Sequence, residues 1–354
     1  MWPRSGSWTN STRAEPGAGP WATPRLESGP VDREGGPIAE RWTYTKGLHD
    51  LGHGAYAYLQ PDGGWGWSNA GLIVDGDQSL LVDTLFDAPL TREMLVAIDR
   101  ATGLRAEAID TVVNTHANGD HTHGNGLCTG AEIIASAASA AEMEALPASR
   151  LAEMMDAAAE LGTAGAYLAD IFGPFDFTDV AERLPTRTFA GRLSLTVGDK
   201  AVELFEVGPA HTEGDVVVHL PGEAVVFTGD IAFIDGTPII WVGPVANWVK
   251  ACQLIIDLEP DVVVPGHGPI TDTAGVGRVQ DYLRYLDAEA RPRFDAGMSV
   301  RDAANDIALA EFEAWGDAER IVINVDTLFR EYRDDGSESD VLALFGLIGE
   351  LRGR

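Results

Sequence analysis

The sequence predicts an α/β protein made of two mixed α/β halves followed by a helical tail. Short apolar runs typical of buried strands recur along the chain, and turn-forming Gly, Pro, Asn or Asp residues bound many of them. Between two such runs, 80–82 and 109–113, lies a segment with helical spacing, which gives a strand–helix–strand order. After residue 276 the apolar residues follow a helical period to the end of the chain.

The first half begins with order near Tyr44 and contains four predicted strands. Strands 70–74 and 80–82 are joined by a hairpin turn at residues 76–79. A helix begins at Pro89 and ends at Gly103, and strands 109–113 and 132–135 follow.

An Ala- and Met-rich region then predicts a helical insertion at about residues 138–180. Leu151, Met154, Met155, Ala158 and Leu161 mark one face of a helix. We interpret the methionines as core packing.

The second half is rich in strands and leads into the helical tail. The predicted strands are 193–197, 202–207, 215–220, 224–228 and 261–264. Asn247 is the predicted N-cap of a helix that Pro260 ends. We therefore divide the chain into an N-terminal arm that is disordered or loosely packed (1–42), a catalytic domain (43–290) and a C-terminal helical extension (291–354).

Composition limits the classes of partner. The 354 residues carry 25 Lys and Arg against 55 Asp and Glu, a formal charge of −30. Nucleic acid and anionic membranes both need a basic surface, so neither is expected as a partner. There is no predicted membrane span or apolar signal segment, and the chain has only 2 Cys, so we expect a cytoplasmic location.

The chemistry-bearing residues stand at the ends of predicted strands. The densest segment is Thr115-His116-Ala117-Asn118-Gly119-Asp120-His121, in which alternate residues of an extended loop project to one side. His211, Asp230 and His267 each follow a later strand. One loop and three strand ends can thus present polar groups to one point.

Together these residues resemble the metallo-β-lactamase-fold hydrolases, whose motif His-x-His-x-Asp-His is followed by a His, a bridging Asp and a final His. The resemblance covers about residues 50–290 and includes Asp83 at the family's early aspartate position. It implies an αβ/βα sandwich of two mixed sheets packed face to face, with the metal site at one sheet edge. The C-terminal helical extension would follow this sandwich.

The sequence departs from the motif at Asn118, where the family has a second His. By the resemblance, the first metal site would comprise His116, Asn118 and His211, with Asp230 shared. An amide is a poorer zinc ligand than an imidazole, so we expect this site to be weakened or empty. The second site keeps its full set, and we expect a single metal there; its ligands are Asp120, His121, Asp230 and His267.

The resemblance implies a hydrolase that uses metal-bound hydroxide. We expect one Zn²⁺ per chain, with two as the alternative, and the donor set also suits Fe²⁺ or Mn²⁺. The predicted catalytic residues are Asp120, His116, Asn118 and His211, and Asp83 would orient the ligand loop. The expected substrate is a small, partly apolar ester, thioester, lactone or activated aryl halide. The single-site pattern, chain length and helical insertion also resemble hydrolytic dehalogenases of the chlorothalonil-dehalogenase type.

Two other classes of function stay open, a mononuclear iron oxygenase and a metal-free binding module. His123 is an alternative ligand for the first site, and His53 is a candidate for the pocket wall. We also expect aromatic walls around the pocket, from Trp65, Trp67, Phe233, Trp241 and Trp248. The only expected partners are a small-molecule substrate and a second copy of the chain, bound through the C-terminal helices.

Overall fold

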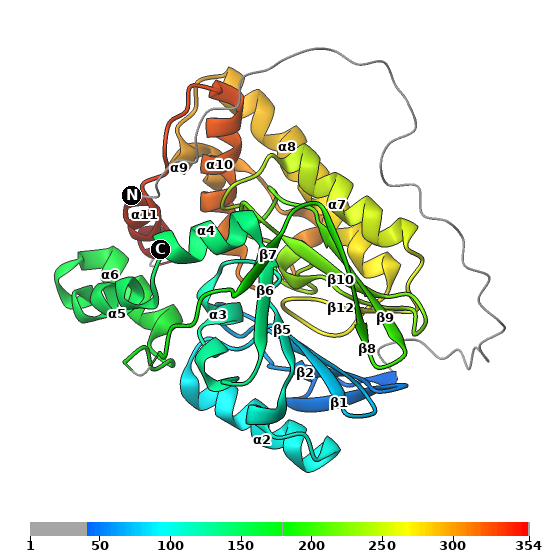
Figure 1. Ribbon diagram of the computed structural model, residues 1–354. Helices are drawn as coiled ribbons and strands as arrows, with labels where there is room; N and C mark the ends of the chain where they lie inside the picture. Colours follow the sequence, from blue (N-terminus) through cyan, green and yellow to red (C-terminus); the bar gives the residue numbers. More distant parts are fainter. Residues whose placement is uncertain (1–40, 179, 353–354) are drawn as a thin grey trace.

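The computed structural model describes residues 41–178 and 180–352, which form two β-sheets packed face to face with helices on both outer faces (Figure 1). The predicted αβ/βα sandwich of two mixed sheets, with a C-terminal helical region, is therefore confirmed. The predicted N-terminal arm lies outside the described residues, apart from its last two.

The first sheet has seven strands in chain order. Strands β1 to β4 form an antiparallel meander, and β4 to β7 run parallel to one another. The hairpin predicted at residues 76–79 joins β3 to β4, although the pairing already begins at Asp75 and Gln78. The strands are β1 (Gly47–Gly52), β2 (Ala55–Leu59), β3 (Ala70–Asp75), β4 (Gln78–Val82), β5 (Thr111–Val113), β6 (Glu132–Ser136) and β7 (Arg187–Phe189).

The second sheet has five strands in the order β12-β11-β10-β9-β8. Its pairs are antiparallel except for β11 with β12, so β9, β11 and β12 point the same way. The strands are β8 (Arg192–Val197), β9 (Lys200–Glu206), β10 (Val216–Leu220), β11 (Val225–Phe227) and β12 (Val262–Val264).

Three layers of apolar side chains hold the sandwich together. Residues of both sheets, such as Val113 and Val218, fill the space between the sheets. Helix α2 (Ala88–Thr102) covers the outer face of the first sheet through Met94 and Ile98. Helices α7 (Val245–Asp257), α8 (Thr273–Asp295) and α10 (Ile321–Arg333) cover the second sheet.

The predicted helical insertion is three short helices rather than one long one. These are α4 (Ala137–Ala145), α5 (Ala148–Asp156) and α6 (Gly162–Phe172). Pro147 precedes α5 and separates it from α4, because proline cannot continue a helix that needs its N–H. Gly162 has a φ of 61° between the last two, a conformation that favours glycine.

The C-terminal part is continuous with the sandwich. Helix α8 runs through residue 290, so the boundary predicted there falls inside a helix. Helices α9 (Val300–Asp306) and α11 (Val341–Arg352) complete this part, and α11 packs on α6 of the insertion (Figure 1). None of the described helices combines the length and apolar character that a membrane span needs.

The helix predicted to begin at Asn247 begins instead at Val245, with Pro244 in the N-cap position. Asn247 therefore lies inside the first turn. Its side-chain amide donates to the carbonyls of Val207 and Pro209, so it ties the helix to the loop that carries His211.

Candidate metal centre

Five loops that follow strand ends bring the polar residues together at one edge of the sandwich. Asp83 follows β4, and the loop of His116 to His121 follows β5 in the first sheet. His211, Asp230 and His267 follow β9, β11 and β12 of the second sheet. The strands of each sheet that carry these loops run in the same direction, so their carboxyl ends meet at one place.

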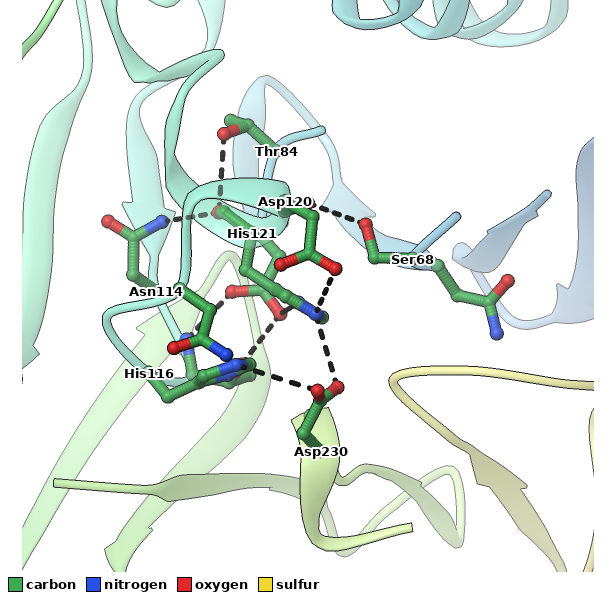
Figure 2. A network of polar contacts seen from close by, with 12 residues as sticks. Ser68, Thr84, Asn114, His116, Asp120, His121 and Asp230 are labelled. Carbon is green, nitrogen blue, oxygen red and sulfur yellow. Dashed lines mark hydrogen bonds and ion pairs between the residues drawn. The ribbon is translucent and has the colours of Figure 1, made fainter. Parts of the chain in front are cut away.

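Backbone hydrogen bonds fix the ligand loop (Figure 2). The carbonyl of His121 accepts from the Thr84 hydroxyl at 3.2 Å and from the Asn114 amide at 3.0 Å. The carbonyl of Asp120 accepts from the hydroxyl of Ser68 at 2.5 Å. The positions of Asp120 and His121 are thus set by residues from three different segments.

Asp83 binds this loop from beneath. Its carboxylate, 2% exposed, accepts from the Thr115 amide N–H and hydroxyl, both at 2.7 Å, and from His121 Nδ1 at 2.9 Å. Burial raises the pKa of Asp83, and His121 and the Thr115 donors partly offset this effect. Asp83 therefore contacts the ligand loop. Its predicted role, to orient this loop for metal binding, stays a prediction.

The hydrogen bonds of Nδ1 determine the tautomer of all four central imidazoles. Nδ1 of His211 contacts the carbonyl of Ile239 at 2.7 Å, and Nδ1 of His267 contacts that of Gly63 at 3.1 Å. A carbonyl only accepts, so both Nδ1 atoms carry the proton. Nδ1 of His121 donates to Asp83, and Nδ1 of His116 donates to the Thr115 hydroxyl, whose own proton is given to Asp83. In the neutral form of each ring, the Nε2 atom therefore presents a lone pair.

All four Nε2 atoms lie within 3.7 Å of a carboxylate oxygen of Asp120 or Asp230, and Figure 2 shows His116 and His121 beside these carboxylates. Asp230 has an oxygen 3.1 Å from Nε2 of His121, and the other lies 3.2 Å from Nε2 of His211 and 3.5 Å from that of His267. Nε2 of His267 is also 3.2 Å from an Asp120 oxygen. Gly266 allows this approach, since a Cβ there would lie 2.0 Å from Asp230 Oδ1. A lone pair and a carboxylate oxygen repel unless a cation lies between them.

The site therefore fits a metal ion. Nε2 of His116, Nε2 of His121 and Oδ1 of Asp230 are buried without a hydrogen-bond partner. Burial opposes charge in every group here, yet the carboxylates raise the pKa of His121 and His267, and the imidazoles lower that of Asp230. Protons can thus stand in for a cation. Imidazole nitrogens with carboxylate oxygens are the donor set that zinc prefers among residues without sulfur.

Two overlapping groups of ligand atoms have the spacing that a metal needs. One is His116, His121 and Asp230, and the other is Asp120, His121 and His267, with the chosen atoms within 4.8 Å of one another. His121 belongs to both groups, and its single lone pair can serve only one cation. The two groups therefore cannot both use Nε2 of His121 at the same time.

Asn118 contacts His211 directly. Its amide nitrogen lies 3.1 Å from Nε2 of His211, and since that Nε2 carries no proton, the amide donates to it. The lone pair that the predicted first site needs from His211 is thus already in use. The remaining N–H of this amide is free to face a substrate.

A cavity of about 870 Å³ opens over these residues. Asn118, Asp120, His211, Asp230 and His267 all contribute to its wall. Trp65, Phe233 and Trp241 line it as expected. Phe233 also stacks on His267, with the rings 5.0 Å apart and 3° from parallel.

Other candidates from the sequence lie elsewhere. Nδ1 of His123 contacts the Phe86 carbonyl at 3.1 Å and its ring stacks on Phe86, so it lines the cavity but joins neither ligand group. His53 lies in the exposed β1–β2 turn. Trp67 packs against Phe175, and Trp248 is fully buried in the core. These two tryptophans are not among the described residues that line the cavity.

The sequence alone did not indicate the contribution of the C-terminal part. Arg320, 2% exposed, forms an ion pair with Asp317 and lies over the rings of Trp65 and Phe233 at the cavity wall. Phe345 of α11 lines the same cavity. Both residues lie beyond the segment that carries the motif. The one sequence signal was that Arg320 is a charged residue beside an apolar helical segment.

Comparisons with known proteins agree with this geometry. The model of the metallo-beta-lactamase superfamily matches residues 63–267. The beta-lactamase-like protein 2 homolog of Drosophila melanogaster is 26% identical over 118 residues, which are 32% of this chain and 39% of the fly protein. The chain thus spans well under half of that relative.

Two solved structures share the fold. A metallo-beta-lactamase from Pontibacter korlensis has a TM-score of 0.50 at 19% identity, covering 67% of this chain and 98% of that one. The stereoselective inverting sec-alkylsulfatase Pisa1 from Pseudomonas sp. has a TM-score of 0.59 at 17% identity, covering 81% of this chain and 50% of that one.

Proposed function

The chain belongs to the metallo-β-lactamase superfamily, and on this premise we propose that it is a metal-dependent hydrolase that works with one zinc ion on a small, partly apolar substrate. The ligands would be Asp120, His121, Asp230 and His267. The observation that supports this proposal is the convergence of imidazole lone pairs on two carboxylates, with His121 shared between the two possible groups. When bound, such a cation supplies a Lewis acid that lowers the pKa of water toward neutrality.

The residues left over have the chemistry to handle the substrate. Burial lowers the pKa of His116 and of His211, so both are neutral near pH 7. Nε2 of His116 carries an unused lone pair and can accept the proton that water loses as its oxygen attacks the substrate. The second N–H of the Asn118 amide can donate to the oxygen on which charge develops. The proton then passes to the leaving group.

The substrate class within this proposal is an ester, thioester, lactone or activated aryl halide. An uncharged electrophilic carbon beside an apolar group would suit a cavity whose wall combines the metal centre with aromatic rings. No particular contact favours one of these bonds over the others, so a panel of all four is the appropriate screen.

The test is metal content by plasma mass spectrometry, combined with turnover of that panel. About one zinc per chain is expected. His267→Ala should lose metal and turnover, whereas His211→Ala should keep the metal and lose about a hundredfold in kcat. Equal loss of metal in the two variants would contradict the single-site proposal. Iron with oxygen uptake would favour the oxygenase, and absence of metal would favour the binding module.

We also propose that the chain forms a homodimer through its C-terminal helices. Leu347 and Leu351 of α11 are apolar, stay partly exposed and are not among the described residues that line the cavity. Light scattering on the eluting protein tests this directly, and a monomer at all concentrations would refute it.

A further inference from the structure

The cavity extends well beyond the metal centre into an apolar chamber, by which we mean the part between the insertion and α11. Its wall includes Phe86, Leu151, Met154, Phe172, Trp241 and Phe345. These residues come from the first sheet's edge, from helices α5 and α6, from the loop before α7 and from α11. Methionine and aromatic side chains together make a surface that adapts to apolar groups of different shape.

Helices α6 and α11, which both contribute to the chamber wall, pack closely against each other. A Cβ at Gly349 would lie 2.8 Å from the carbonyl of Thr163, so the two helices approach each other closely at the glycine. Arg352 of α11 forms an ion pair with Asp170 of α6 at 2.9 Å. Two of the elements that contribute to the chamber wall are therefore fixed against each other.

Apolar side chains also line the mouth of the cavity. Val96, Leu184 and Leu342 are exposed large apolar residues, with exposed fractions of 47%, 39% and 39%. Leu184 and Leu342 both belong to the cavity lining, whereas Val96 lies on α2 on the opposite side of the first sheet. Exposed leucines beside an apolar chamber offer additional contact area to an apolar ligand.

The charge around the mouth restricts the ligand further. Among the described lining residues outside the metal centre are five carboxylates, those of Glu142, Glu153, Glu182, Glu338 and Asp340. The guanidinium groups there belong to Arg150 and Arg183, besides the ion-paired Arg320. Arg183 already donates to the carbonyls of Cys128 and Ala131. An anionic ligand would therefore meet repulsion at the entrance.

We propose that the chamber binds the extended apolar group, of about ten to fifteen non-hydrogen atoms, of an uncharged substrate. The bond to be broken would then lie at the metal centre. This inference rests on the proposed hydrolase and narrows its substrate class. Polyanionic thioesters, such as those of nucleotide-bearing carriers, are disfavoured, while neutral esters, lactones and aryl halides remain.

The first experiment measures binding without catalysis. N-phenyl-1-naphthylamine and 8-anilinonaphthalene-1-sulfonate share a ring system, fluoresce in apolar sites and differ in one negative charge. Both are titrated into the chelator-treated and the metal-loaded protein. We expect the neutral probe to bind with a stoichiometry near one in both forms. Affinity for the anionic probe should rise about threefold or more from low to high salt, because salt screens the carboxylates.

Matched variants locate the binding site. Leu342→Asp should weaken the neutral probe about tenfold, because it places a charge on the apolar wall, whereas Val96→Asp should change it less than twofold. The double change Glu153→Gln and Glu338→Gln should strengthen the anionic probe severalfold. The same change at Glu144 and Glu160, exposed glutamates of the insertion region, is the control. Equal effects of the two aspartate variants would overturn the assignment of the chamber.

The second experiment links the chamber to turnover. In Leu342→Asp, KM for 4-nitrophenyl decanoate should rise about tenfold, whereas in Val96→Asp it should stay within twofold. Probe binding without hydrolysis of any ester would leave the chamber intact and refute the hydrolase. Hydrolysis with the same KM in both proteins would refute the chamber and leave the hydrolase.

Discussion

Replacement of Asp83 by asparagine should weaken metal binding without changing a metal ligand. The carboxylate of Asp83 accepts three hydrogen bonds, two from Thr115 and one from Nδ1 of His121. An asparagine of the same shape offers one oxygen and one NH2 group. Whichever way the amide is turned, at least one of these donors faces another donor. If that donor is Nδ1, His121 must move its proton to Nε2, the atom that should bind the metal.

The size of the effect follows from these contacts. Loss of a carboxylate behind a metal-binding imidazole costs about 10- to 100-fold in metal affinity, or about 1.4 to 2.7 kcal/mol. One unsatisfied buried donor should also lower the free energy of unfolding of the metal-free protein by about 1 to 3 kcal/mol. Both losses should appear together, because the same three hydrogen bonds also anchor the loop of His116 to His121.

The assay is titration of the metal-free variant with zinc against a chelating indicator, with urea unfolding in parallel. Asp87→Asn is the matched control, since Asp87 is also buried and its carboxylate accepts from the N–H groups of Leu90 and Asp176 at 2.8 and 3.0 Å. This control should lose about 1 kcal/mol of stability and keep its metal affinity. An Asp83→Asn protein that binds zinc as tightly as the control would refute the tautomer reasoning.

Three further predictions concern the same region. Asn118→His should raise the zinc content toward two per chain by plasma mass spectrometry, because it removes the donor that occupies His211; unchanged content would contradict this reading of the loop. Metal removal should lower the melting temperature more at pH 9 than at pH 6. The pKa of His267 is raised to about 9, so its proton stabilises the metal-free fold below pH 6.5 and is lost as the pH rises to 9. An equal drop in melting temperature at the two pH values would contradict this reasoning. Burial raises the pKa of Glu142 to about 7, so the free energy of unfolding should fall as the pH rises from about 4.5 to 7, and Glu142→Gln should remove about 1 to 2 kcal/mol of this fall in urea titrations, after allowance for partial exposure.

The layout of the fold could be predicted because its signals are local. Strand β3 and helix α2 each have a clean apolar period and a glycine at the next turn, Gly76 and Gly103, both with positive φ. Strand β1 was not predicted because His49, Asp50 and Gly52 interrupt its apolar pattern. The partner strand, not the residues themselves, makes this segment extended.

The residues of the candidate site could be predicted only where they are neighbours in sequence or follow predicted strands. Asp120 and His121 are neighbours in sequence, and the other ligands end strands whose carboxyl ends must meet. The tautomer of His267, by contrast, depends on the carbonyl of Gly63, 204 residues away. The cavity wall depends on α11, which follows the motif by more than 70 residues. Neither contact leaves a periodic or spacing signal.

Asn118 stands where the family has a histidine, and this difference affects how protons and metal compete for the imidazole nitrogens. A site with complete histidine sets for two metals would use its imidazole lone pairs on two cations. Here the Asn118 amide donates to the lone pair of His211 and so occupies it. What remains is His121 between two carboxylates, together with Nε2 of His116, which has no hydrogen-bond donor. In the proposed function, a single cation held by His121 would neutralise the repulsion between that imidazole and both carboxylates. The lone pair of His116 would stay available to accept a proton from water at neutral pH, because burial keeps the pKa of His116 low. On this view the asparagine separates the group that holds the metal from the group that moves the proton.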